Sequence, residues 1–344
     1  MTLPAEIGAV LDGRSEGCVQ APFPWFGGKR QVAGLVWERF GDVQNYVEPF
    51  FGSGAVLLNR PGDHENTLET VNDKDGYIAN FWRAVQRDPD AVAFHADHPV
   101  NENDLHARHS WLLGQRDTLV SRLEGNPDFY DAKIAGWWCW GICCWIGHGF
   151  CSGSGPWQVV DGQLVHLGNK GQGVNRKRVH LGNKGQDGEP ETRGIYGWFQ
   201  ELADRLRYVR VCCGDWSRVC GPTPTVKQGL TGVFLDPPYA VEDRSDCYNV
   251  EDRDVAHAVR EWAIQWGDDA RMRIALCGYE GEHQMPDSWG CVPWKARGGF
   301  ASQSKQHDNP NARRERVWFS PHCLVPVREQ RAGQMALFGE GAKK

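Results

Sequence analysis

The tetrapeptide Asp236-Pro-Pro-Tyr239 closes the apolar run Gly232–Asp236 and combines residue types that suit the binding of a planar amine. The two prolines remove backbone donors and stiffen the segment, so the Asp236 carboxylate and the Pro237 carbonyl remain as acceptors beside the Tyr239 ring. Acceptors next to an aromatic face suit an exocyclic amino group. The alternative interpretation is a rigid turn between a strand and a loop.

The segment Tyr46-Val-Glu-Pro-Phe-Phe-Gly-Ser-Gly54 leaves a predicted strand and enters the apolar pattern Ala55–Asn59, which predicts a helix. A strand, a glycine-rich turn and a helix in this order present backbone N–H groups to a nucleotide-like ligand. Glycines in such turns also serve tight packing alone, so both interpretations stay open.

Two further strand-like runs end near acidic residues. Val71-Asn-Asp73 ends in a carboxylate that can bind both hydroxyls of a ribose. The alternative is an N-cap for a helix over Asp75–Val85, and both roles can coexist at neighbouring positions. Cys213-Gly-Asp-Trp216 closes the other run.

A sheet is needed to bring these residues together, and the apolar pattern predicts one. The seven runs with β-rich character are Asn45–Glu48, Thr67–Asn72, Tyr208–Cys213, Gly232–Asp236, Met272–Gly278, Gly290–Trp294 and Arg316–Ser320. Helical patterns lie between several of them, most clearly over Asp252–Trp266. This alternation predicts a mainly parallel α/β sheet, and the closeness of the last two runs predicts a β-hairpin at its edge.

The alternation lapses between Gln86 and Gly194, which predicts an insertion. Within it the octapeptide VHLGNKGQ occurs twice, at Val165–Gln172 and at Val179–Gln186. The segment that spans both copies has no acidic residue, and its basic residues are Lys170, Arg176, Lys177, Arg178 and Lys184. A tandem duplication in a solvated loop and a basic loop along a nucleic-acid backbone both explain this pattern.

Three motifs, in this order, resemble the Dam-type, alpha-group DNA adenine-N6 methyltransferases. Pro22-Phe-Pro-Trp-Phe-Gly-Gly-Lys29 is similar to the Trp-x-Gly-Gly-Lys element of that family, Glu48–Gly54 to its Asp-Pro-Phe-x-Gly-Ser-Gly element, and Asp236–Tyr239 to its catalytic tetrapeptide. The resemblance covers most of the chain outside the insertion. Glu48 departs from the family's aspartate but keeps the charge.

The resemblance implies a Rossmann-like methyltransferase that uses S-adenosylmethionine to modify adenine-N6 in double-stranded DNA. The catalytic residues would be Asp236, Pro237, Pro238 and Tyr239. The cofactor-binding residues would be Trp25, Gly28 and Lys29 around the cofactor, Glu48, Phe50, Gly52 and Gly54 at its methionine and sugar, Asp73 at its ribose, and Asp215 and Trp216 at its adenine. The alternatives are a cytosine-N4 or RNA methyltransferase of the same fold and a catalytically silent DNA-binding module.

The implied reaction needs proximity and acceptors rather than a metal, because a methyl group on a sulfonium is already activated. The adenine amino group is a poor nucleophile, and its N–H groups would donate to Asp236 and to the Pro237 carbonyl. Since a base inside a duplex is out of reach, the target would be flipped out and stacked on Tyr239.

The insertion occupies the family's usual place for target recognition. We therefore expect an N-terminal extension at 1–20, a catalytic domain at 21–85 and 195–325, a target-recognition region at 86–194 and a flexible tail at 326–344. The polar segment Ala240–Val250 predicts a loop that orders over the flipped base, with Arg244 and Tyr248 as DNA contacts. An ordinary solvated loop is the alternative.

The tail segment Gln334-Met-Ala-Leu-Phe338 resembles the pentapeptide with which bacterial replication and repair proteins bind the sliding clamp. Gln334, Leu337 and Phe338 would be the anchors in a preformed groove. A terminal helical turn that folds back on the domain is the alternative. A monomer is expected, because transfer to one flipped base needs one active site.

The chain has 344 residues, a net charge of -6 and 40% hydrophobic residues. This composition excludes a disordered, collagen-like or coiled-coil chain, but a local basic strip is still sufficient for DNA binding. Residues 1–20 have no basic segment followed by an apolar run, so we expect no secretory signal, reduced cysteines and a cytoplasmic protein of a bacterial or phage-infected cell.

The apolar window Ala135–Phe150 is too short to span a membrane and predicts buried structure. Its region contains the possible zinc ligands Cys139, Cys143, Cys144, His148 and Cys151. The tryptophans and isoleucines between them favour packing as small apolar groups over a metal site.

Overall fold

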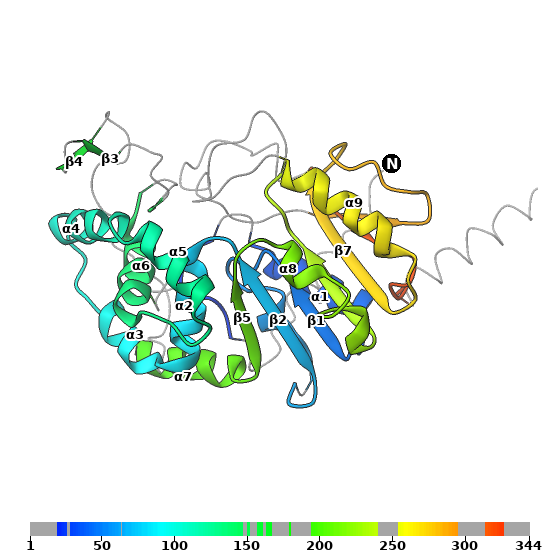
Figure 1. The fold of residues 1–344 in the computed structure, drawn as a ribbon, viewed down its shortest axis with the longest axis horizontal. Helices are drawn as coiled ribbons and strands as arrows, with labels where there is room; N and C mark the ends of the chain where they lie inside the picture. Colours follow the sequence, from blue (N-terminus) through cyan, green and yellow to red (C-terminus); the bar gives the residue numbers. More distant parts are fainter. Residues whose placement is uncertain are drawn as a thin grey trace, which may run out of the picture.

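The computed structural model describes residues 19–25, 28–62, 64–146, 150–151, 157–160, 163–166, 179, 194–239, 254–294 and 314–326, with the backbone alone for 157–160 and 163–166. Figure 1 shows a twisted sheet and a group of helices beside the edge that β5 forms. The described part of the chain is therefore built from a sheet with its covering helices and from this lateral helical group.

Seven strands form the sheet. They are β1 (Asn45–Glu48), β2 (Leu68–Asp73), β5 (Val209–Cys213), β6 (Thr231–Leu235), β7 (Met272–Tyr279), β8 (Gly290–Pro293) and β9 (Glu315–Phe319). Their order is β5-β2-β1-β6-β7-β9-β8; β9 pairs antiparallel with both of its neighbours, and all other pairs are parallel. The mainly parallel α/β sheet is confirmed, and each strand lies within one residue of its predicted run.

The order of the strands reverses direction at β1. From β1 the chain proceeds to β2 and β5 on one side, whereas β6 and β7 lie on the other side. In open parallel sheets, ligands bind beyond the carboxyl ends of the strands that flank such a reversal. Glu48 ends β1 and Asp236 directly follows β6, so both lie at the point where this rule places a ligand.

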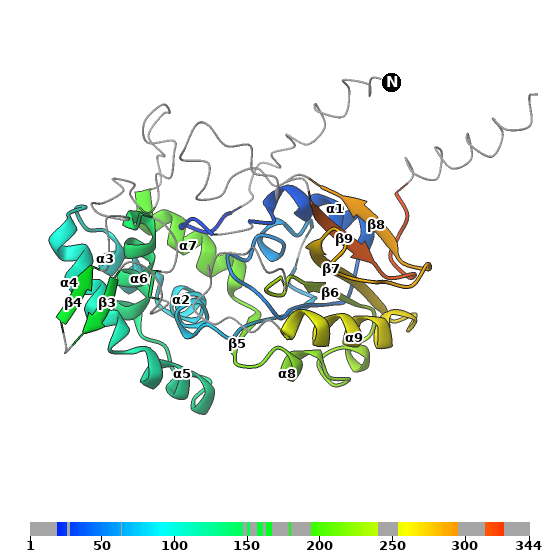
Figure 2. The same cartoon turned by 90° about the horizontal axis from the view of Figure 1, so that it is seen from above.

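The two faces of the sheet are covered by different helices, as Figure 2 shows. Helix α1 (Arg30–Phe40) packs with Phe234 on one face, whereas α8 (Ser217–Cys220) and α9 (Val255–Gly267) pack with Val233 and Leu235 on the other. This division follows from the alternation of side chains along a strand. The described part of α9 agrees with the helix predicted over Asp252–Trp266.

The pattern Ala55–Asn59 does not form the predicted α-helix. The chain makes a turn followed by one short 3-10 helix, η2 (Leu57–Asn59), and Arg60 is already extended with ψ 126°. Pro61 provides the reason, because a proline disfavours helical backbone angles in the residue before it. The prediction of a helix after the glycine-rich turn was therefore wrong.

The lateral group consists of helices that surround α2 (Gly76–Arg87). They are α3 (Pro89–Ala96), α4 (Glu102–Leu113), α5 (Arg116–Gly125), α6 (Ala132–Cys144) and α7 (Gly194–Leu206). The apolar window Ala135–Phe150 contributes most of α6, where Trp138, Cys139 and Trp140 are at most 1% exposed. The prediction of buried structure there is confirmed.

A separate two-stranded antiparallel sheet consists of β3 (Trp157–Val160) and β4 (Gln163–His166). The first repeat copy begins in β4, and most of both copies lies outside the described residues. Among the helices that are described, none combines the length and apolarity required to cross a lipid bilayer.

Candidate active site

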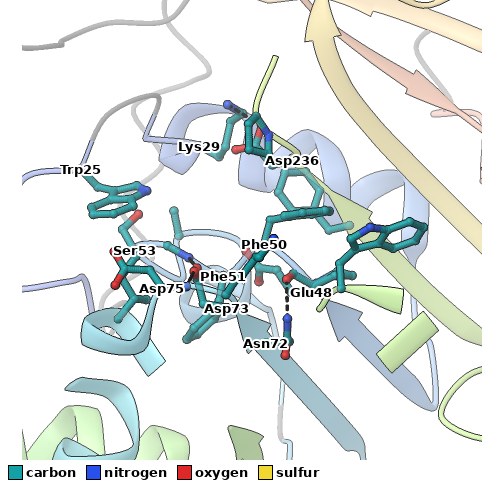
Figure 3. Close-up of a pocket in the computed structure, with 18 of the residues that line it drawn as sticks. Trp25, Lys29, Glu48, Phe50, Phe51, Ser53, Asn72, Asp73, Asp75 and Asp236 are labelled. Carbon is teal, nitrogen blue, oxygen red and sulfur yellow. Dashed lines mark hydrogen bonds and ion pairs between the residues drawn. The ribbon is translucent and has the colours of Figure 1, made fainter. Parts of the chain in front are cut away.

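A cavity of about 900 Å³ opens beyond the carboxyl ends of β1, β2, β5 and β6 (Figure 3). The predicted site residues that line it are Trp25, Gly28, Lys29, Glu48, Phe50, Gly52, Asp73, Asp215, Trp216, Asp236 and Pro238. Gly54, Pro237 and Tyr239 are not among its lining residues. The predicted cofactor and catalytic segments therefore meet at one place, although they are far apart in the sequence.

The turn after β1 contains two glycines with left-handed backbone angles, Gly52 with φ 48° and Gly54 with φ 63°. A Cβ atom at Gly52 would lie 2.4 Å from Nε1 of Trp25, and one at Gly54 would lie 2.7 Å from the Phe51 ring. Both positions thus exclude a larger residue on conformational and steric grounds. The packing interpretation applies to both glycines, and Gly52 in addition lines the cavity.

Glu48 lies on the floor of the cavity and is 2% exposed. Its Oε2 accepts a hydrogen bond of 2.8 Å from the Tyr46 hydroxyl. Burial raises the pKa of Glu48 well above its usual range, although hydrogen bonds from Tyr46 and the Leu57 backbone act in the opposite direction. The Glu48 carboxyl group is therefore fixed by a hydrogen bond in the cavity that Asp236 also lines.

Asp73 organises the turn through both of its carboxylate oxygens. Oδ2 accepts from the Gly52 backbone N–H at 2.9 Å, and Oδ1 accepts from the Asp75 backbone N–H at 2.9 Å. The N-cap of α2 is Asp75, whose carboxylate accepts from the Tyr77 backbone N–H. Asp75, and not Asp73, therefore caps α2, and both residues line the cavity.

Asp73 predicts a pH dependence of stability. Burial first, and repulsion from Asp75 second, raise the pKa of Asp73 from 3.8 to about 7. A carboxyl group with a raised folded-state pKa binds protons more tightly when folded, so its contribution to the free energy of unfolding falls as the pH rises from about 4 to about 7. We expect Asp73→Asn to remove this slope, which is at most about 1.4 kcal/mol per pH unit.

Urea unfolding of the wild type and Asp73→Asn at several values between pH 5 and 7 measures the difference in slope. Asp204→Asn, a change at an exposed position on α7, is the control and should leave the slope unchanged. Parallel curves for wild type and Asp73→Asn would show that the Asp73 carboxyl titrates normally in the folded protein.

Phe50 and Trp216 form an aromatic pair at the cavity. Their rings are nearly parallel, with centroids 6.3 Å apart and planes at 28°. Trp216 also contacts Trp262 of α9 edge to face at 6.3 Å.

The Asp215 carboxylate is hydrogen-bonded to a residue close by in the sequence, because its Oδ1 accepts from the backbone N–H of Ser217 at 3.0 Å. The Ser217 hydroxyl is a second donor to it and the main cause of a lowered Asp215 pKa.

Lys29 and Asp236 form an ion pair with Nζ 3.0 Å from Oδ1, and the two side chains are 6% and 18% exposed. The Tyr239 hydroxyl lies 3.2 Å from the same Asp236 oxygen and donates at 2.8 Å to Oε2 of Glu315. The Lys29 ammonium is 5.3 Å from the centre of the Tyr239 ring. Lys29, Asp236 and Tyr239 thus form one connected group at the end of β6.

Several residues of the site were not identified from the sequence. Phe51, Ser53 and Asn72, which lie within the predicted motifs, and Lys74 and Asp75, which directly follow one, also line the cavity. Their position next to the strand ends was the available signal. Glu315 gave no such signal, because it comes from β9, 76 residues after Tyr239.

The remaining predicted sites lie wholly or partly outside the described residues. This holds for the DNA contacts Lys170, Arg176, Lys177, Arg178, Lys184, Arg244 and Tyr248, for the clamp residues Gln334, Leu337 and Phe338, and for His148. Cys139, Cys143, Cys144 and Cys151 are buried. In the part of the chain that is described, no group of three or more potential metal ligands is assembled.

Comparison with known proteins supports the interpretation of these motifs. The family model for D12 class N6 adenine-specific DNA methyltransferases matches residues 25–112, which include the turn after β1 and the end of β2. The DNA N-6-adenine-methyltransferase of Escherichia phage P1 is 30% identical over 102 residues. That match covers 28% of this chain and 13% of the phage protein. The resemblance predicted from the motifs is confirmed over this part of the chain.

Proposed function

We propose that this chain transfers a methyl group from S-adenosylmethionine to the N6 atom of an adenine in double-stranded DNA. The observation that carries the proposal is the meeting of three segments at one cavity: the glycine-rich turn after β1, the acidic end of β2 and the Asp-Pro-Pro-Tyr segment after β6. The match to the N6 adenine-specific family supports the choice of base.

The residues that line the cavity fit the chemistry of this cofactor. Its ribose hydroxyls and its ammonium group need acceptors, and carboxylates are present at Glu48, Asp73 and Asp75. Its adenine is a planar ring that fits between the aromatic faces of Phe50 and Trp216. A ring between them needs a contact distance of about 3.5 Å on each side, or about 7 Å in all, so the two rings, now 6.3 Å apart, would have to separate slightly.

When bound, the cofactor supplies a methyl group that its sulfonium has already activated. The task of the chain is to make the acceptor amine more nucleophilic and to stabilise its developing positive charge. We assign these roles to the Asp236 carboxylate and the Pro237 carbonyl as hydrogen-bond acceptors. Among the described residues, both contacts to the Asp236 carboxylate end on Oδ1, so Oδ2 is the atom assigned to the amine.

Entry of a flipped base would require movement near Tyr239. The Tyr239 side chain is 9% exposed, with the Lys29 ammonium over its ring and the Tyr279 ring against it edge to face at 4.6 Å. A base stacks on this ring only when one of its faces is free. The proposed base flipping therefore includes displacement of Lys29 or of the tyrosine as the base enters.

Recognition of the DNA sequence is proposed to fall to residues 86–194. The basic segment Val165–Gln186 would follow the DNA backbone, and Arg244 and Tyr248 would contact the DNA near the flipped base. Binding to a sliding clamp through Gln334, Leu337 and Phe338 and a monomeric state are further proposals. They extend the proposed activity but are not required for it.

The proposed function predicts a labelled product. Incubation of the purified chain with isotopically labelled S-adenosylmethionine and mixed-sequence duplex DNA should yield labelled N6-methyladenine after digestion to nucleosides, identified by mass spectrometry. Label on cytosine would retain the fold and the reaction but replace the base. Absence of label on DNA, despite measurable cofactor binding, would favour an RNA substrate or a silent DNA-binding module.

A further inference from the structure

We propose that Glu315 is a positioning residue for this reaction: it engages the Tyr239 hydroxyl and thereby keeps the Asp236 carboxylate free of a competing donor. This inference rests on the proposed methyl transfer. Glu315 lies on β9, outside every segment that carries the family resemblance, and the match to the adenine-specific family ends at residue 112.

The hydroxyl of Tyr239 lies between two carboxylates. It is 2.8 Å from Oε2 of Glu315 and 3.2 Å from Oδ1 of Asp236. A hydroxyl carries one proton, so at any moment it donates to one of these oxygens only. The shorter distance assigns the proton to Glu315, and Asp236 then keeps its electron pairs for Lys29 and for the substrate amine.

The backbone on either side of Glu315 holds this carboxylate in place. Glu315 stands opposite Tyr279 in the register between β7 and β9, and its carbonyl accepts from the Trp294 backbone N–H at 3.2 Å. The same carbonyl accepts from the Arg316 guanidinium at 2.9 Å. Glu315 is 5% exposed, so water has little access to compete for the tyrosine proton.

The charged residues around Glu315 also bear on its role as the acceptor of the Tyr239 proton. The Lys29 ammonium pairs with Asp236 and also acts on the Glu315 carboxyl group. Burial raises the pKa of Glu315, and Lys29 opposes this shift. Burial likewise raises the pKa of Tyr239 well above its usual range, so the tyrosine is a donor at neutral pH. A charged Glu315 is the better acceptor for that proton.

Glu315→Gln tests the proposal, because it keeps the shape of the side chain and removes the charge. We expect the maximal rate of methyl transfer to fall roughly tenfold, with the KM for S-adenosylmethionine unchanged within about twofold. In a Tyr239→Phe background, which lacks the proton in question, the same substitution should change the rate less than about twofold. Glu280→Gln is the matched control, because this neighbouring carboxylate is 64% exposed and pairs with Arg316.

A measurement that does not depend on activity accompanies the rates. In protein labelled with ¹³C at the tyrosine ζ-carbon, the Tyr239 signal is assigned by its loss in Tyr239→Phe, and it should shift in Glu315→Gln but not in Glu280→Gln. An unchanged signal would overturn the hydrogen bond, even if the chain transferred no methyl group. If the wild type is active, two results would overturn the positioning role. One is that Glu315→Gln lowers the rate equally in the wild-type and Tyr239→Phe backgrounds, and the other is that Glu315→Gln leaves the wild-type rate unchanged.

Discussion

Asp236→Asn is expected to reduce methyl transfer about 10²- to 10³-fold, the effect typical of losing one preorganised group that stabilises charge in a transition state. The asparagine keeps the shape of the side chain but removes the negative charge opposite the developing positive nitrogen. Binding of S-adenosylmethionine should stay within a few-fold of wild type, because the proposed cofactor acceptors are other carboxylates of the cavity. Methylation rates and calorimetric titration with the cofactor measure the two effects separately.

The same substitution also removes the ion partner of Lys29, whose side chain is 6% exposed. We expect a loss in the free energy of unfolding below the roughly 3–5 kcal/mol typical of a broken, fully buried pair, because the Asp236 side chain is 18% exposed. Asp128→Asn, at a carboxylate that is 81% exposed and pairs with Arg87, is the matched control. A rate within tenfold of wild type for Asp236→Asn would remove Asp236 from the proposed mechanism.

The strands were predictable because their signal is local. The clearest case is β6, a short apolar run that is buried along its whole length and is followed directly by Asp236, and a strand buried on both faces has this composition wherever it occurs. The rule that ligands bind at the carboxyl ends of parallel strands then brought Glu48, Asp73 and Asp236 together without any knowledge of their contacts. This explains why most predicted cofactor residues line one cavity.

Other features depend on neighbours that local patterns do not encode. The apolar pattern Ala55–Asn59 favours a helix, but Pro61 ends it after one 3-10 turn. Asp75 caps α2, whereas Asp73 accepts from the Gly52 backbone N–H of the glycine-rich turn and from the Asp75 backbone N–H, so its contacts depend on a turn 21 residues away. Glu315 meets Tyr239 only because β9 pairs with β7, a long-range contact that no motif indicates.

Helix α6, which lies in the region predicted to be an insertion, is not independent of the cavity. Trp138 of α6 contacts Phe23 with ring centroids 4.9 Å apart, and Phe23 contacts Trp25 at 6.1 Å. Trp25 in turn lines the cavity. A chain of aromatic contacts therefore connects the region proposed to recognise DNA with the wall of the proposed cofactor site, and one hydrophobic core includes both.

Gly52→Ala is expected to weaken binding of S-adenosylmethionine about tenfold or more, which corresponds to about 1.4 kcal/mol. The new Cβ atom would lie 2.4 Å from Nε1 of Trp25. The backbone cannot yield easily, because the Gly52 N–H donates to Asp73 and its carbonyl accepts from the Trp82 indole at 2.8 Å. Trp25 must therefore move from its place in the cavity wall.

Gly62→Ala separates this steric effect from the strain of the backbone. Gly62 also has a left-handed angle, φ 86°, but no described atom lies within 4 Å of the position that its Cβ would take. The left-handed backbone alone should cost each variant about 1–2 kcal/mol in the free energy of unfolding, and Gly52→Ala should lose more because of its steric clash; urea titration measures both losses. Only Gly52→Ala should lose cofactor affinity in calorimetric titration. If the two variants bound the cofactor equally well, the contact between Trp25 and the glycine-rich turn would not contribute to the site, and the proposed position of the cofactor beside Trp25 would be wrong.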